Sequence, residues 1–118
     1  MTGVVVNAGI CGFTATIKIS KIAKRKVDIK IISDCEMVIK LSESIPELDT
    51  RDVLKPGAAS EVHHQASIHA LHTACPVPVA ILKAIEVEMG MALARDVMIH
   101  FETSERDRLP FKNPVKSK

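Results

Sequence analysis

Two neighbouring runs of alternating apolar and polar residues constrain the fold of this chain more than any other feature. Residues 13–20 place Phe13, Ala15, Ile17 and Ile19 on one face, and residues 26–33 repeat the pattern with Val27, Ile29 and Ile31. Strict alternation is typical of a β-strand with one buried face. Because only a short basic stretch separates the runs, we expect an antiparallel hairpin that turns one face toward a core.

The remaining elements are expected around this hairpin. Strands are predicted at 3–7 and at 96–102, the latter with Val97, Ile99 and Phe101 inward, and helices at 33–45, at 59–72 and from Pro76 or Pro78 to about Gly90; residues 45–58 are predicted to be a loop. Ser33 and Glu36 have the spacing of a capping box, which makes Ser33 the predicted N-cap. The order predicts an α+β fold, a small antiparallel or mixed sheet with helices packed on one face.

Length and charge narrow the class of protein. The chain has 118 residues, of which 47% are hydrophobic, with a net charge of +2. We expect one domain at 1–104, followed by a charged, proline-broken and mobile tail at 105–118. The small net charge argues against nucleic-acid and membrane partners. Without a membrane-spanning apolar run or a secretory signal, we expect a cytoplasmic protein, in which three cysteines stay free rather than form disulfides.

The three cysteines all fall at predicted boundaries between elements. Cys11 lies in a glycine-flanked turn before a strand, Cys35 lies in the first turn of a helix, and Cys75 lies at the start of the last helix. Helix N-termini favour thiolate over thiol, and the thiolate is both the nucleophile and the metal ligand. We therefore expect the three sulfurs to converge on a metal, and Cys75 to be partly accessible with a lowered pKa. The alternative is that cysteines pack as small hydrophobic residues.

Histidines precede Cys75 along the chain. His69, His72 and Cys75 are spaced three apart, so His72 is a candidate fourth ligand of a Cys₃His set. A solvent-facing helix surface is an equal explanation for His72. It is the better explanation for His63, His64 and His69, and His100 is expected to point outward from its strand.

The order of these motifs resembles the NifU/IscU-type iron–sulfur cluster scaffolds. "ICGFTATIKIS", "IKIISDCEMVIKLSES" and "HTACPVPVAILKAIE" are similar to the three cysteine motifs of that family, with gaps of 24 and 40 residues between the cysteines. The resemblance covers about residues 7–90. It implies a SufE/NifU-like fold and ligand roles for Cys11, Cys35 and Cys75. Phe13 stands where that family has a ligating aspartate, so the resemblance does not supply the fourth ligand.

A second, local resemblance covers about residues 71–102. "CPVPV", followed by a helix and the run "DVMIHFE", is similar to the CPxP motif of TusA-type sulfur carriers, in which the thiol at the helix start carries a persulfide. It implies a nucleophilic Cys75 and leaves Cys11 and Cys35 without a role.

The leading hypothesis is a cytoplasmic domain that binds an iron–sulfur cluster or zinc through Cys11, Cys35 and Cys75, with His72 as a possible fourth ligand. Such a protein is a binding or scaffold protein more than a catalyst, and its partners would be sulfur-donor or cluster-acceptor proteins. The alternatives are a sulfur carrier that uses Cys75, and a small interaction domain whose cysteines pack in the core. Nucleotide-binding and hydrolase motifs are not found in the sequence. The oligomeric state is left open.

Overall fold

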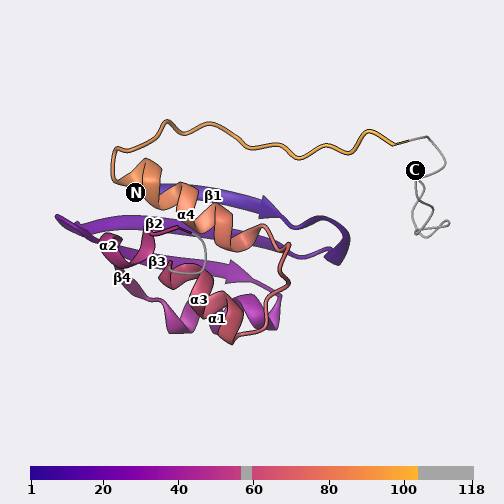
Figure 1. Cartoon of the computed structure of the whole chain (residues 1–118), viewed down its shortest axis with the longest axis horizontal. Coiled ribbons are helices and arrows are strands. Elements are labelled where there is room, and N and C mark those ends of the chain that lie inside the picture. Colours follow the sequence, from indigo (N-terminus) through magenta and orange to yellow (C-terminus); the bar gives the residue numbers. More distant parts are fainter. Residues whose placement is uncertain (57–59, 104–118) are drawn as a thin grey trace.

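The computed structural model of the chain describes residues 1–56 and 60–103, and its central feature is a four-stranded antiparallel sheet (Figure 1). The strands are β1 (Thr2–Asn7), β2 (Thr14–Ala23), β3 (Lys26–Ser33) and β4 (Glu47–Asp49), and they lie in the order β1-β2-β3-β4. Each strand therefore pairs with its neighbour in the sequence. The expected α+β fold is confirmed.

Helices cover one face of this sheet. The α-helices are α1 (Glu36–Ser44), α2 (Thr50–Val53), α3 (Glu61–Ile68) and α4 (Val77–Glu88), and the 3₁₀ turn η1 (Gly9–Cys11) connects β1 to β2. α4 packs on β1 and β2, α1 packs on β3, and α3 contacts both α1 and α4 (Figure 1). No helix among the described residues is long and apolar enough to cross a membrane.

The core forms between the hairpin and the helices, as the alternation predicts. Ala15, Ile17 and Ile19 of β2 are at most 1% exposed, and Val27 and Ile29 of β3 are buried beside them. From the helices, α4 contributes its own buried stripe: Val77, Pro78, Ile81, Ala84 and Ile85. Phe13 differs from the prediction, because it precedes β2 and is 41% exposed.

The start of α1 differs from the predicted capping box. The N-cap is Cys35 rather than Ser33. Ser33 is still part of β3 and is paired with Ala15, and α1 begins only at Glu36, so Ser33 lies two residues too early to be the N-cap. Its hydroxyl oxygen instead accepts a hydrogen bond from the Cys35 N–H at 3.2 Å. Cys35 consequently sits one step before the first turn of the helix.

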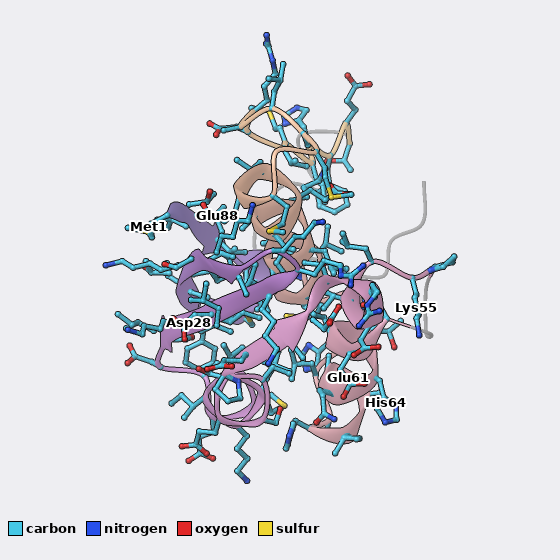
Figure 2. All side chains as sticks on the ribbon, turned by 90° about the vertical axis from the view of Figure 1, so that its left-hand side faces the viewer. Met1, Asp28, Lys55, Glu61, His64 and Glu88 are labelled. Carbon is cyan, nitrogen blue, oxygen red and sulfur yellow. The ribbon has the colours of Figure 1, made fainter. Side chains whose placement is uncertain are left out.

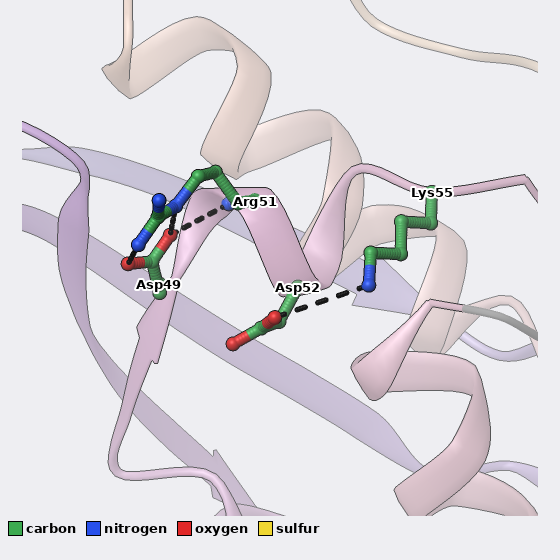
Figure 3. A network of polar contacts seen from close by, with 4 residues as sticks. All are labelled: Asp49, Arg51, Asp52 and Lys55. Carbon is green, nitrogen blue, oxygen red and sulfur yellow. Dashed lines mark hydrogen bonds and ion pairs between the residues drawn. The ribbon is translucent and has the colours of Figure 1, made fainter.

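The predicted loop at 45–58 contains a strand and a helix, β4 and α2, in its described part. Asp49 forms the junction between them: its carboxylate accepts from the Arg51 N–H at 2.8 Å as the N-cap of α2 and also pairs with the Arg51 guanidinium at 3.2 Å (Figure 3). The Arg51 side chain is the main cause that lowers the pKa of Asp49. Asp52 and Lys55 form a longer ion pair at 4.0 Å.

The helix predicted at 59–72 is shorter than expected. α3 ends at Ile68 because Ala70 adopts a left-handed backbone conformation with φ of 60°. The N–H groups of Ala70 and Leu71 donate to the carbonyls of Ser67 and Ala66, which is the Schellman pattern that terminates a helix. Residues 69–76 therefore form the connection that leads to α4.

The prediction of a strand at 96–102 is wrong. The chain there is extended but belongs to no strand of the sheet, and Val97, Ile99 and Phe101 are 59%, 78% and 75% exposed. A strand requires hydrogen bonds to a neighbouring strand, and the described part of this chain does not place one beside this segment. The predicted tail at 105–118 lies outside the described residues.

Candidate thiol site

The three cysteines lie at one end of the sheet. Cys11 is in the connection from β1 to β2, Cys35 is in the connection from β3 to α1, and Cys75 comes two residues before α4. In the antiparallel order, the end of β1, the start of β2 and the end of β3 are neighbours. The topology thus brings together thiols that are 24 and 40 residues apart in the sequence.

All three cysteines line a single small cavity of about 20 Å³, which we call the three-thiol hollow. Its other lining residues are Ala8, Phe13, Thr14, Ala15, Ser33, Val38 and Val77. A cavity of this size has room for about one water molecule or one ion. The fold therefore places Cys11, Cys35 and Cys75 around one hollow, and their convergence on a metal stays a prediction.

Cys11 forms the exposed rim of the hollow. It is the last residue of η1, between Gly9 at φ of 86° and Gly12 at φ of 79°. Both angles lie in the left-handed region that glycine adopts without strain. The turn is closed by a hydrogen bond from the Gly12 N–H to the Gly9 carbonyl at 2.9 Å, and the Asn7 side chain accepts from the Gly9 N–H at 3.2 Å. This tight turn holds Cys11 against the ends of β1 and β2.

Cys35 forms the buried floor of the hollow. It is 9% exposed, and its carbonyl accepts the first hydrogen bond of α1, from the Ile39 N–H at 2.9 Å. Val38, one turn into α1, is buried and lines the same hollow. The backbone of Cys35 is thus fixed at both sides, by Ser33 before it and by the helix after it.

Cys75 lies between these two extremes, half-buried at the start of α4. Its N–H donates to the His72 carbonyl at 3.0 Å. The expectation of partial accessibility is confirmed, but the expectation of a lowered pKa is wrong. Burial raises the pKa of Cys75, the neighbouring thiols of Cys11 and Cys35 add to that rise, and the Val77 N–H only partly offsets it. Loss of hydration thus outweighs the helix terminus at this position.

The chemistry of the hollow follows from the residues that surround the sulfurs. It is lined by apolar residues, by Thr14 and Ser33 and by the three cysteines, and by no charged side chain. A second or third thiolate would therefore form against the repulsion of the first, with no cationic side chain in the lining to balance it. A bound cation would supply the missing positive charge, since a metal binds thiols in place of their protons.

The sulfurs are gathered but not arranged as a ready coordination shell. Within residues 1–56 and 60–103, no three His, Cys, Asp or Glu side chains stand in a geometry that could hold a metal ion. His72 is exposed and is not among the residues that line the hollow, and His69 is the C-cap of α3. His64 is exposed on α3 (Figure 2), and His100 is exposed in the segment after α4.

Sequence reasoning missed the apolar walls of the site. Phe13, Val38 and Val77 line the hollow, although none has a side chain that ligates or reacts. Their signal is position alone, because each lies two or three residues after one of the cysteines. Such neighbours of a ligand exclude water and set the local dielectric of a site.

Comparison with known proteins places the chain in a family without assigning an activity. The model of a family described as a family of unknown function (DUF6951) matches residues 2–101. No curated protein matches the chain. No solved structure matches it either.

Proposed function

We propose a function for this chain, which belongs to the family of unknown function DUF6951, from the geometry of its three-thiol hollow. The domain binds a thiophilic metal, as a zinc ion or an iron–sulfur cluster, through Cys11, Cys35 and Cys75. One observation supports this proposal above others: three cysteines from three separate connections line one cavity of about 20 Å³.

The donor set fits a soft metal. Thiolates are the preferred ligands of zinc and of iron–sulfur clusters, and the lining offers three thiols without a competing carboxylate. When bound, the metal supplies the positive charge that this lining lacks, so the three thiols can release their protons. The sulfurs must also close on the metal. The side chain of Cys11 has the most room to do so, because it is exposed, whereas Cys35 is buried.

The open side of the hollow bears on what the bound group does. Cys11 is exposed, so a ligand from outside could reach a metal held by the three cysteines, and His72 would complete the set only if its connection moved toward the hollow. Sites with an open position exchange ligands, whereas closed four-ligand sites are structural. We infer a binding or scaffold protein that passes its metal or cluster to an acceptor protein, in the reducing cytoplasm where thiols stay free.

Anaerobic purification followed by metal analysis and absorption spectroscopy tests this proposal. The chain contains no Trp or Tyr, so thiolate-to-metal bands are not masked by protein absorption. We expect about one zinc ion or one cluster per chain, and we expect Co²⁺ to give charge-transfer bands that disappear in Cys75→Ala. Protein that contains no metal and binds neither Co²⁺ nor reconstituted iron and sulfide would overturn the proposal.

A second candidate function is a sulfur carrier with a persulfide on Cys75. The observation that favours it is the position of Cys75, which is half-buried at the N-terminus of α4 with the Val77 N–H favouring its thiolate. The raised pKa of Cys75 weighs against an unaided nucleophile. Mass analysis separates the candidates: a carrier would show one added sulfur on Cys75 that a reducing agent removes, in protein without metal.

A further inference from the structure

The segment after α4 exposes a large share of the apolar surface of this protein. We call residues 91–102 the terminal segment. Six of its large apolar side chains are 59–85% exposed: Met91, Leu93, Val97, Met98, Ile99 and Phe101. A cluster of exposed apolar side chains of this kind marks an interaction surface.

The end of the terminal segment has the sequence pattern of a strand. Val97, Ile99 and Phe101 alternate with Met98, His100 and Glu102, so one side is wholly apolar and the other is mixed. The chain there is extended, as a strand is, but is paired with none of the described strands. It thus has the side-chain pattern of a sheet strand without the hydrogen-bonding partner.

A well-defined helix end directs the terminal segment. The Met91 N–H donates to the Glu86 carbonyl at 2.8 Å, and the Gly90 N–H donates to the Val87 carbonyl at 3.1 Å, with Gly90 at φ of 76°. These are the two hydrogen bonds of a Schellman motif. Beyond it the chain turns back and runs in the direction of β1 as a separate extended ribbon (Figure 1). The direction of the terminal segment is therefore set by a hydrogen-bonded turn at the end of α4.

The same side of the molecule offers an open sheet edge. β1 lies at the edge of the sheet and pairs only with β2 among the described strands. The outward N–H and C=O groups of such an edge strand form a template for another strand. β1 has six residues, and residues 97–102 number six as well. One chain therefore carries both an extended segment that pairs with none of the described strands and an edge of matching length.

We propose that the protein forms a two-fold symmetric dimer in which the terminal segment of each copy adds to the β1 edge of the other. A second copy is the partner that uses both features at once, since each chain supplies one strand and one edge. The exchange then closes on itself, as a two-fold interface does, instead of growing into a fibre. The side with Val97, Ile99 and Phe101 turns toward the partner's helix-covered face.

The apolar area is of the size that a stable dimer needs. Met98 faces away from the proposed interface. With about 100 Å² exposed on each of the other five apolar side chains, two copies would bury roughly 1,000 Å² of side-chain surface, about the minimum for a specific interface before backbone and β1 are added. The match to the family model extends to residue 101, so the terminal segment belongs to the family's domain.

Sedimentation of the full chain over a range of concentrations tests the proposal. We expect the wild-type protein to be dimeric at micromolar concentration. Ile99→Lys should weaken the dimer by 30-fold or more, because it places a charge on the side that faces the partner. Met98→Lys is the matched control: this neighbour is exposed on the opposite side, and we expect less than a threefold effect. Ile99→Pro removes a strand N–H and should also give monomer.

Three results would overturn the proposal. A wild-type protein that stays monomeric up to millimolar concentration would do so. If the amides of residues 97–101 in such a monomer resist hydrogen exchange, the chain covers its own β1 edge. A dimer that is unaffected by Ile99→Lys and Ile99→Pro would use another surface, and equal losses in Ile99→Lys and Met98→Lys would reject the assigned side. Circular dichroism checks that every variant keeps the wild-type fold.

Discussion

The two ends of the sheet are built from different chemistry. At the end where α4 finishes, the Glu88 carboxylate accepts hydrogen bonds from the Thr2 hydroxyl at 2.7 Å and the Lys21 N–H at 2.9 Å. It also pairs with the amino group of Met1 at 3.3 Å, and Figure 2 shows Met1 and Glu88 side by side. We call this set the Glu88 clasp. At the other end, three thiols line a hollow that has no charged side chain in its lining.

This contrast suggests that one end of the sheet stabilises the fold and that the other end carries the candidate site. The Glu88 clasp joins β1, β2 and α4 through a carboxylate whose hydrogen bonds are formed. At the thiol end, Cys35 is part of the hydrophobic core and Cys75 packs against it, while no charged side chain lines the hollow. Three thiols gathered in one hollow are candidates for a site that acts on something else. Substitutions at the two ends should therefore affect different properties.

The largest effect is expected from removing a buried thiol. Cys75→Ala and Cys35→Ala should each weaken metal binding by more than about 100-fold, because even outer-shell substitutions cost 10- to 100-fold. Thermal unfolding of the metal-free variants should change little at Cys75, which is only half-buried. Competition titration with a chromophoric chelator measures the affinity.

Glu88→Gln is the control from the opposite end. It should bind metal as the wild-type protein does while being less stable. If Glu88→Gln weakened metal binding as much as Cys75→Ala, the two ends would not be independent.

The next effect concerns the clasp itself. Glu88→Gln should lower the free energy of unfolding by about 1–2 kcal/mol, since hydrogen bonds to a charged group are lost and the pair with Met1 is solvent-screened. The Glu88 side chain is only 12% exposed. Glu86→Gln, two residues earlier in α4, is the matched control and should have little effect, because no side-chain hydrogen bond or ion pair of Glu86 is formed with the described residues.

The contribution of Glu88 should also depend on pH with a definite sign. The Thr2 hydroxyl is the main cause that lowers the pKa of Glu88 below its ordinary 4.5, followed by the Lys21 N–H. A lowered pKa stabilises the folded state above pH 4.5, and this contribution disappears as the pH falls through the folded-state value. Urea unfolding at neutral pH and at successively lower pH below 4.5 should therefore show a difference between wild type and Glu88→Gln that is full at neutral pH and shrinks as the pH falls. A difference that persists in acid would point to packing instead.

A smaller effect distinguishes the three thiols from one another. In metal-free protein at neutral pH, alkylation should modify Cys11 first, Cys75 more slowly and Cys35 last, following their exposure. Because burial raises the pKa of Cys75 above 9.0, its rate should still be rising beyond that pH. Peptide mass analysis after timed quenching measures the order. Cys75 reacting faster than Cys11 at neutral pH would restore the sulfur-carrier hypothesis.

Much of the fold could be read from the sequence where the pattern depends on local periodicity. The hairpin, its buried face and α4 follow from alternation and from Pro76 and Pro78, which fit only a helix start. Residues 96–102 show the limit of this approach. Their alternation is as regular as that of 13–20, but pairing depends on an edge that arrives from elsewhere, which sequence periodicity cannot specify.

The gathering of the three cysteines was predictable from the sequence, but the electrostatics around them was not. Three cysteines at element junctions indicated Cys11, Cys35 and Cys75, and the topology places all three at one hollow. The expectation of a lowered pKa for Cys75 took only the helix N-terminus into account. Burial and two neighbouring thiols act in the opposite direction, and both depend on contacts across the sequence.

The smallest effect is expected at Ala70, which begins the connection leading to Cys75. Ala70 holds φ of 60° at the end of α3, a conformation that glycine adopts at lower cost. Ala70→Gly should raise the free energy of unfolding by about 0.5–1 kcal/mol, offset in part by the greater freedom of glycine in the unfolded chain. Ala74→Gly, in the same connection at negative φ, is the control and should be neutral or destabilising. Thermal unfolding measures both variants. Metal affinity should not change in Ala70→Gly, because the substitution keeps the backbone path to Cys75, and a loss of affinity would mean that the strained turn itself positions the thiol.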